Sequence, residues 1–162
     1  MDLPVLILGV DPGPVESALV IIDTDYNVKR HFYGDNLDVA SIIVEYDSLN
    51  NHLVCEFIQS YGNITGKSTF FTCKTVGQYE GFWNDPETFF IYARPTIKGG
   101  LVGSVSKVKD KHIRNALRQR FGESRKGSPL EGITKHKWAA LAVAVFHLDC
   151  IKAGSEEFMV FK

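Results

Sequence analysis

Three apolar, β-rich runs open the chain with only short turns between them, and this pattern limits the possible folds more than any other feature. The runs are Pro4–Val10, Ala18–Ile22 and Val28–Gly34, and the turns are Asp-Pro-Gly at 11–13 and the polar segment 23–27. Proline fixes φ, glycine accepts positive φ, and Asp and Asn side chains bond to nearby backbone, so both connections have turn chemistry. Three strands joined by short turns predict an antiparallel meander.

Helical and strand patterns alternate after the meander. Apolar residues recur at helical spacing in some segments, whereas others are short apolar runs. We expect helices over Leu37–Leu49 (capped by Asn36), Gly66–Phe82, Lys109–Phe121 and Thr134–Ile151, and strands over Leu53–Ile58 and Phe89–Ala93. The order βββ-α-β-α-β-α-α predicts an α/β fold, with a mixed five-stranded β-sheet (antiparallel meander plus parallel strands) flanked by helices.

Length and composition fit one ordinary domain. The 162 residues, 44% of them hydrophobic and 23% charged, predict a single domain over 1–162 with a full core. No apolar run is long enough to span a bilayer, and no basic region precedes the first one, so we expect a soluble, cytoplasmic protein. The cysteines are Cys55, Cys73 and Cys150. Their odd number and the lack of Cys-x-x-Cys spacing favour free, buried thiols over disulfides or a zinc site.

Charge is distributed unevenly along the chain, although the net charge is only −1. Residues 1–93 carry 4 Lys and Arg against 13 Asp and Glu, a net charge of −9. Residues 94–137 carry 12 Lys and Arg against 3 Asp and Glu, a net charge of +9. The basic segment fits a surface for a polyanion and fits a solvated helix face equally well.

Two carboxylates lie at or in apolar strands. Asp11 follows the first strand directly, and Glu56 lies inside the run Leu53–Ile58. A buried, unpaired carboxylate is costly, so Glu56 must lie at an edge, pair with a cation or bind a metal. Together the two favour a site for a hard cation, Mg²⁺ or Mn²⁺. Asp-Pro-Gly is also a good turn by itself, and Glu56 could instead face outward from a half-exposed strand.

Two further candidates lie in the basic segment. Asp110 begins an expected helix among basic residues, where it could bind metal or stabilise the helix N-terminus. His136 lies near the start of the last helix and could face the carboxylates, or could be structural.

These residues resemble the RuvC-like branch of the RNase H-like superfamily, and in particular the Holliday junction resolvases of bacteriophages and prophages. The resemblance covers nearly the whole chain. It is carried by Gly9-Val-Asp-Pro-Gly13, by Glu56-Phe-Ile-Gln-Ser-Tyr-Gly62, by the segment 109–117 and by the segment 136–144, in that order.

The resemblance implies an RNase H-like fold and a homodimer that binds four-way or branched DNA and nicks two opposed strands. It also implies two divalent ions, Mg²⁺ or Mn²⁺, held by acidic residues, and no organic cofactor. Asp11 and Glu56 match the first two ligand positions, and His136 matches a position that is Asp or His in the family. Three residues further on most resolvases have Asp, whereas this chain has Ala139. Either Asp110 supplies the missing carboxylate or the second ion is weakly held.

On this hypothesis Asp11, Glu56, Asp110 and His136 form the catalytic and metal-binding site, in which two ions activate water and stabilise the leaving oxygen. Basic residues would contact phosphates, and Tyr61 could stack on unpaired bases at the branch point. The proposed nucleic-acid contacts are Lys67, Tyr61, Lys109, Lys111, Arg114, Lys135 and Lys137. Phe57 alternates with Glu56 and is expected in the core.

Three alternatives remain. A sugar-kinase or actin-like ATPase shares the strand and Asp-x-Gly turn, but needs two such domains and a second Gly-rich loop. The ribosomal-RNA-processing nucleases of the same fold share the Gly-Val-Asp-Pro-Gly opening. A junction-binding protein that lost full metal binding with Ala139 would bind branched DNA without cutting it.

Overall fold

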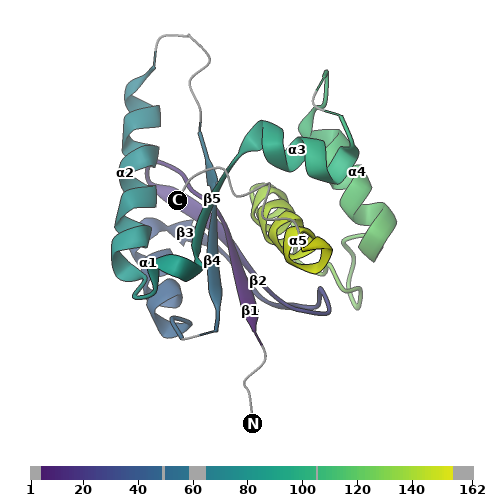
Figure 1. Ribbon diagram of the computed structural model, residues 1–162. Helices are drawn as coiled ribbons and strands as arrows, with labels where there is room; N and C mark the ends of the chain where they lie inside the picture. The colour runs from purple at the N-terminus through teal and green to yellow at the C-terminus, as the bar shows by residue number, and fades with distance from the viewer. Residues whose placement is uncertain (1–4, 49, 59–64, 105, 155–162) are drawn as a thin grey trace.

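The fold is built on a five-stranded sheet with strand order β3-β2-β1-β4-β5 (Figure 1). The strands are β1 (Leu6–Asp11), β2 (Glu16–Asp23), β3 (Val28–Asp35), β4 (His52–Phe57) and β5 (Phe89–Ala93). The first three pair antiparallel, and β1–β4 and β4–β5 pair parallel. The computed structural model describes residues 5–48, 50–58, 65–104 and 106–154. The expected mixed sheet with an antiparallel meander is confirmed.

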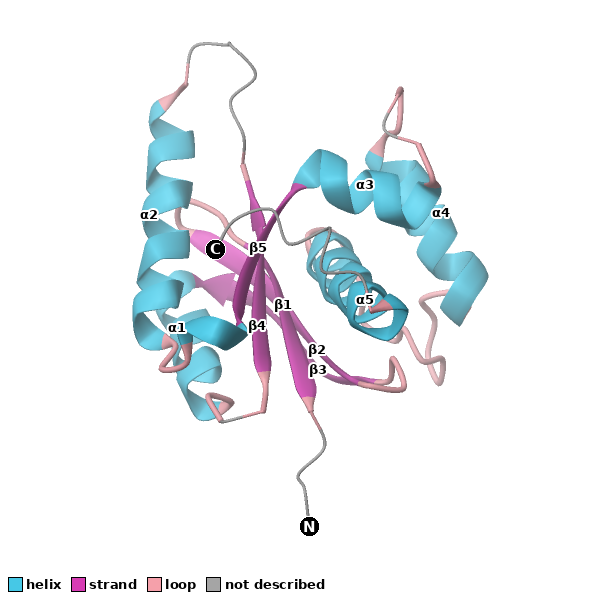
Figure 2. Ribbon diagram, in the orientation of Figure 1, coloured by secondary structure: helices cyan, strands magenta, loops and turns pink. Residues whose placement is uncertain are grey.

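Helices cover both faces of the sheet (Figure 2). One face carries α1 and α2, and the other carries α3, α4 and α5. The bounds are α1 (Asn36–Glu45), α2 (Lys67–Phe82), α3 (Arg94–Val102), α4 (Asp110–Phe121) and α5 (Lys137–Ala153), with a short 3-10 turn, η1 (Pro86–Thr88), before β5. The apolar residues form two core clusters. Because every strand of the parallel part is covered on both sides, β1 and β4 are nearly continuous apolar runs.

Helix α5 lies unusually close to β1. A Cβ added at Gly9 would lie 2.2 Å from the carbonyl oxygen of Ala140 and 2.7 Å from the Cβ of Ala144. Only glycine on the strand and alanine on the helix permit this approach, since any larger side chain would push the two apart. The first turn of α5 is thereby held over the end of β1.

Two details differ from the sequence-based expectations. The helix α3 was not expected; it begins with Pro95 in its first turn and ends at Gly103, whose φ is 77°. Its two internal glycines lower helix propensity, but Gly100 packs against the ring of Phe146, and this tertiary contact needs a residue without a side chain. Asn36 as the cap of α1 is wrong, because Asp35 accepts the hydrogen bond from the Leu37 amide.

Helix bounds differ as well. The first helix ends at Glu45 rather than at position 49, and α5 begins at Lys137 rather than at Thr134. The cysteines Cys55, Cys73 and Cys150 are free, as expected, and the first and last are buried. Cys73 is only half-buried, so the expectation of burial is wrong for it. Among the described residues, no helix combines the length and apolar character needed to cross a bilayer.

Candidate active site

Asp11 and Glu56 lie at the same end of two neighbouring parallel strands. The register pairs Val10 with Cys55, so the two acids are one step further along β1 and β4. Side chains alternate along a strand, and Gly9 faces α5, so Asp11 also faces α5. Their side chains are 18% and 9% exposed. The sheet therefore brings two largely buried carboxylates together under α5.

A polar network fixes the turn after Asp11. The Ser17 hydroxyl accepts a hydrogen bond from the Gly13 amide at 3.2 Å and donates one to Asn36 Oδ1 at 2.6 Å. Asn36 Nδ2 donates to the Gly13 carbonyl at 3.1 Å, and the Tyr79 hydroxyl donates to Ser17 Oγ at 2.9 Å. Since these groups come from β2, α1 and α2, the turn after β1 is tied to three separate elements.

His136 is the N-cap residue of α5 and points at Asp11. Its Nδ1 lies 3.1 Å from Asp11 Oδ2 and, facing a carboxylate, acts as the donor. The imidazole stacks on the ring of Tyr33, with centroids 5.4 Å apart and planes inclined by 13°. Tyr33 in turn donates to Glu16 Oε2 at 3.0 Å. Sequence reasoning missed Tyr33, because nothing local links a residue of β3 to the start of α5.

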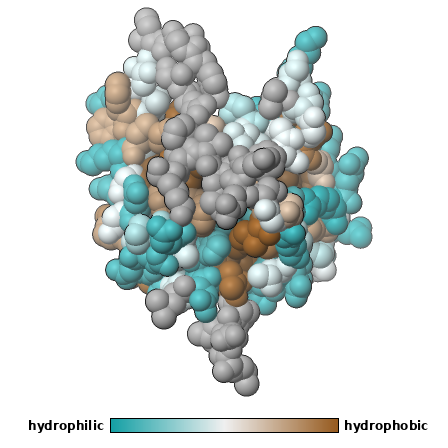
Figure 3. Space-filling model, in the orientation of Figure 1, coloured by the Kyte–Doolittle hydropathy of each residue, from teal (hydrophilic) through white to brown (hydrophobic). Residues whose placement is uncertain are grey.

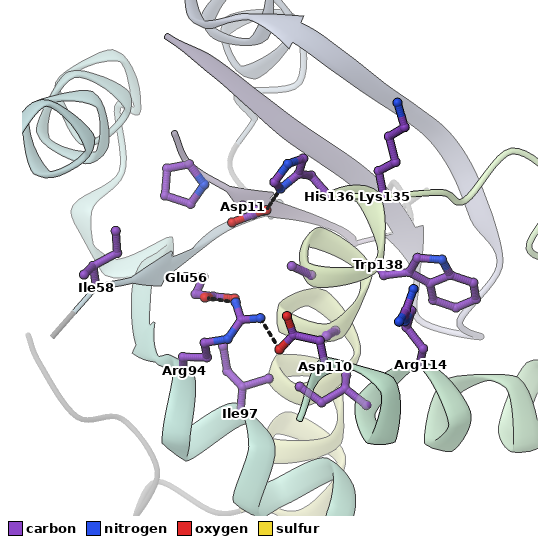
Figure 4. A pocket seen from close by; sticks show the side chains of 14 residues that line it. Asp11, Glu56, Ile58, Arg94, Ile97, Asp110, Arg114, Lys135, His136 and Trp138 are labelled. Carbon is purple, nitrogen blue, oxygen red and sulfur yellow. Dashed lines mark hydrogen bonds and ion pairs between the residues drawn. The ribbon is translucent and has the colours of Figure 1, made fainter. Parts of the chain in front are cut away.

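Arg94 joins the remaining two predicted acids. Its Nη1 lies 2.6 Å from Glu56 Oε1, and its Nη2 lies 2.5 Å from Asp110 Oδ1 (Figure 4). Lys98 Nζ lies 3.9 Å from the same Asp110 oxygen. Sequence reasoning missed Arg94, although it directly follows the buried strand β5, at the sheet edge where Asp11 and Glu56 also lie.

All four predicted site residues line one cavity of about 520 Å³, shown from close by in Figure 4. Seven of the lining residues are charged or titratable, and Arg94 among them was not expected from the sequence. Ala139 and Ala142 of α5 add apolar wall. The charged and titratable lining consists of Asp11, Glu56, Arg94, Asp110, Arg114, Lys135 and His136. The structure thus gathers the candidates, and their roles stay predictions.

Burial dominates the electrostatics of the two strand carboxylates. Desolvation raises the pKa of Asp11, against the lowering effect of His136. Desolvation likewise raises the pKa of Glu56; Arg94 lowers it and the charge of Asp11 raises it. The exposed Asp110 differs, because its hydrogen bond to Arg94 lowers its pKa. His136 and Arg94 therefore offset the burial of the Asp11–Glu56 pair only in part, and an added cation would stabilise the charged carboxylates further.

The donor set suits a hard divalent ion at Asp11 and Glu56. Mg²⁺ is commonly bound by one or two carboxylates and keeps several waters. Among the residues that the structure describes, no three His, Cys, Asp or Glu side chains are placed to hold one ion. Asp110 is instead bonded to Arg94, and His136 is bonded directly to Asp11.

The predicted nucleic-acid contacts are only partly brought together. Arg114 and Lys135 line the cavity, and the exposed Lys109 and Lys111 flank Asp110 on the same side of the sheet. Lys137 instead lies 3.0 Å from His31 Nδ1. Arg114, Lys135, Lys109 and Lys111, without Lys137, form a basic rim beside the two strand carboxylates.

The other candidates lie apart from this rim. Lys67 is at the start of α2 on the opposite face, with its ammonium 5.5 Å from the centre of the Phe71 ring. Tyr61 lies outside the described residues. Phe57 packs against the α1–α2 core cluster, as expected.

Solved structures of known proteins identify the fold. No family model and no curated protein sequence matches the chain. Thermus thermophilus RuvC aligns with a TM-score of 0.65 and 16% sequence identity, over 92% of this chain and 96% of that one. The T. thermophilus RuvC structure in complex with a Holliday junction substrate aligns with a TM-score of 0.64 and 14% identity, over the same shares. The chain therefore has the RNase H-like fold that RuvC has, as its sequence had indicated.

Proposed function

We propose that this protein is an endonuclease that resolves four-way or branched DNA junctions by divalent-ion-dependent phosphodiester hydrolysis. The observation that carries the proposal is the pair of buried carboxylates, Asp11 and Glu56, on adjacent parallel strands beneath a basic rim. The similarity to RuvC, one structure of which contains a Holliday junction substrate, supports the choice of substrate.

Asp11 and Glu56 would hold Mg²⁺ or Mn²⁺ through their carboxylates. When bound, such an ion supplies a nucleophile at neutral pH and stabilises charge on phosphate oxygens. His136 orients the Asp11 carboxylate through its 3.1 Å hydrogen bond. The expectation of two ions, which comes from the resemblance, stays a prediction.

The basic rim would bind the DNA backbone. Arg114 and Lys135 at the cavity wall can meet phosphates next to the scissile bond, and Lys109 and Lys111 extend the contact. Phosphate contacts dominate affinity and release counterions, so binding should weaken steeply as salt rises. A shape-selective resolvase needs such contacts more than base contacts.

We also propose that the protein acts as a homodimer through α2. This helix exposes three aromatic side chains: Phe70 (65% exposed), Phe71 (43%) and Phe82 (47%). Figure 3 shows apolar, brown side chains gathered over α2. Sedimentation should give a dimer for the wild type and for Ile151→Asp, and a monomer for Phe82→Asp. A dimer in all three would remove α2 from the interface.

The deciding experiment uses a labelled four-way junction and a matched linear duplex, with Mg²⁺ or Mn²⁺, for the wild type and Asp11→Asn. Paired nicks in the junction only, lost in the variant, are expected. If structured RNA is cut and the junction is not, the protein belongs with RNA-processing nucleases of this fold.

A second candidate function is junction binding without cutting. It is favoured by Ala139, which lines the cavity at the position where the resemblance calls for Asp. Tight, salt-sensitive binding without nicks in either metal would support it. In that case Ala139→Asp, which adds a carboxylate to the cavity wall, should restore cleavage.

A further inference from the structure

Arg94 occupies the part of the cavity between two of the acids expected to bind metal. Its Nη1 donates to Glu56 Oε1 at 2.6 Å, and its Nη2 donates to Asp110 Oδ1 at 2.5 Å. Charge-assisted hydrogen bonds between a guanidinium and a carboxylate are about twice as strong as neutral ones. Glu56 is 9% exposed and Arg94 is 37% exposed, so this pairing is only partly screened by water.

The charges around the cavity balance when Arg94 is counted. Three carboxylates, Asp11, Glu56 and Asp110, face three permanent cations, Arg94, Arg114 and Lys135. One divalent ion would give the wall the net positive charge that a phosphate needs. A second ion would place two divalent charges beside a guanidinium in a half-buried space, where repulsion between like charges is costly.

We propose that Arg94 takes the place of the second divalent ion, so that the chain binds a single ion, at Asp11 and Glu56. The inference deepens the proposed function and rests on it. Glu56 Oε1 is bonded to Arg94, which leaves Oε2 for the ion beside Asp11. Asp110 acts through Arg94 and is a positioning residue rather than a metal ligand.

Two features of this chain fit that assignment. Ala139 lines the cavity without a carboxylate, at the position where the resemblance calls for a ligand. Asp110 has an exposed side chain, and its hydrogen bond goes to Arg94. A second ion at Glu56 and Asp110 would have to break both arginine bonds and move the guanidinium away. The fixed positive charge of Arg94 does the same neutralising work without an ion.

The test counts Mn²⁺ ions bound per chain, by titration calorimetry and by the electron paramagnetic resonance signal of free Mn²⁺, with and without a four-way junction. The wild type should bind one ion. Arg94→Gln removes the charge and frees Glu56 and Asp110, so it should bind two. Arg94→Lys keeps the charge and should bind one. Two ions bound by the wild type would overturn the inference.

Two asparagine variants give a matched comparison. Asp11→Asn should weaken Mn²⁺ binding by about tenfold or more, as loss of a ligand does. Asp110→Asn removes a partner of Arg94 and not a ligand, so it should weaken Mn²⁺ binding less than Asp11→Asn does, and Arg94→Gln/Asp110→Asn should return to one ion. An equal loss of affinity in Asp110→Asn and Asp11→Asn would make Asp110 a ligand and overturn the inference.

The ion count and the cleavage assay together separate the role of Arg94 from the nuclease activity. Two ions together with junction cleavage would reject only the role of Arg94. Neither Mn²⁺ binding nor cleavage by the wild type would reject both. Circular dichroism and thermal unfolding show whether Arg94→Gln is folded; should it be unfolded, the comparison of Asp110→Asn with Asp11→Asn still decides.

Discussion

Single side chains around the cavity depend on partners from distant parts of the chain. His136 of α5 lies between Asp11 of β1, to which it donates, and Tyr33 of β3, on which it stacks. Tyr33 is itself tied to Glu16 of β2. An exposed imidazole with only one hydrogen bond would sample several rotamers, so the stacking ring limits its direction.

Removing the ring of Tyr33 should therefore loosen His136. We expect Tyr33→Ala to lower the rate of junction cleavage by about tenfold, since small misplacements of site groups are costly. Tyr33→Phe keeps the stack and loses only the bond to Glu16, and should stay within about twofold. The imidazole ¹⁵N chemical shifts of His136 should change in the alanine variant alone. Equal rates for both variants would show that the stack has no positioning effect.

Packing between whole elements sets the height of α5 above the sheet. The contact at Gly9 lets the alanine-rich face of α5 lie directly on β1, and the first turn of α5 carries His136 to Asp11. Residues 138–148 of this helix are almost all apolar and buried, because the sheet, α3 and α4 enclose this part of it. Site geometry thus follows from one close helix–strand contact.

A methyl group at Gly9 should disturb this contact. We expect Gly9→Ala to lower the free energy of unfolding by about 2–3 kcal/mol, because the added Cβ meets the backbone oxygen of Ala140. Gly77→Ala is the matched control: nothing lies within 4 Å of its added Cβ, and alanine should raise helix stability by about 0.5–1 kcal/mol. Urea unfolding measures both. A stable Gly9→Ala protein would mean that α5 can shift without cost.

The whole molecule contains a buried polar chain away from the cavity. His147 of α5 is fully buried, and its ring nitrogens lie 2.8 Å from Tyr92 Oη and 2.8 Å from His52 Nδ1. Burial, followed by the charge of His52, lowers the pKa of His147 to about 3. Burial also lowers the pKa of His52. Both imidazoles are thus held neutral, linking α5 to β4 and β5.

The buried polar chain of Tyr92, His147 and His52 predicts that the fold is less stable in acid. A histidine with a lowered folded-state pKa binds its proton more readily when unfolded, so its stabilising effect is complete above about pH 6.5. The effect is lost progressively as pH falls below 6.5 toward about 3. The raised pKa values of Asp11 and Glu56 act in the opposite direction, in the range where carboxylates titrate. We expect the urea midpoint to fall between pH 7 and pH 5.

His147→Gln provides the control for this prediction. Glutamine keeps a neutral donor and acceptor near Tyr92 and His52 but cannot be protonated. Its urea midpoint should vary less between pH 7 and pH 5 than that of the wild type. An equal change of the urea midpoint with pH in both proteins would show that the acid sensitivity comes from other groups. A single cooperative transition in the same experiment would support one domain over 1–162.

Much of the fold could be predicted from local patterns. The meander and the strands β4 and β5 follow from short apolar runs and turn residues, and α2, α4 and α5 from helical spacing. The unexpected α3 shows the limit: its two internal glycines argue against a helix locally, and the contact of Gly100 with Phe146 decides otherwise. Asp35 rather than Asn36 caps α1 because Asn36 is engaged with the turn at Gly13.

The sequence by itself determined that Asp11 and Glu56 lie at or in buried strands, because a carboxylate among apolar residues is visible without a structure. It also determined the place of the last helix, and that the basic segment 94–137 follows an acidic one over 1–93. Only the tertiary structure decided that Arg94 stands between Glu56 and Asp110, and that Tyr33 stacks on His136. Those contacts join elements far apart in the chain, and their distances depend on how closely α5 and α3 pack on the sheet, which no local pattern specifies.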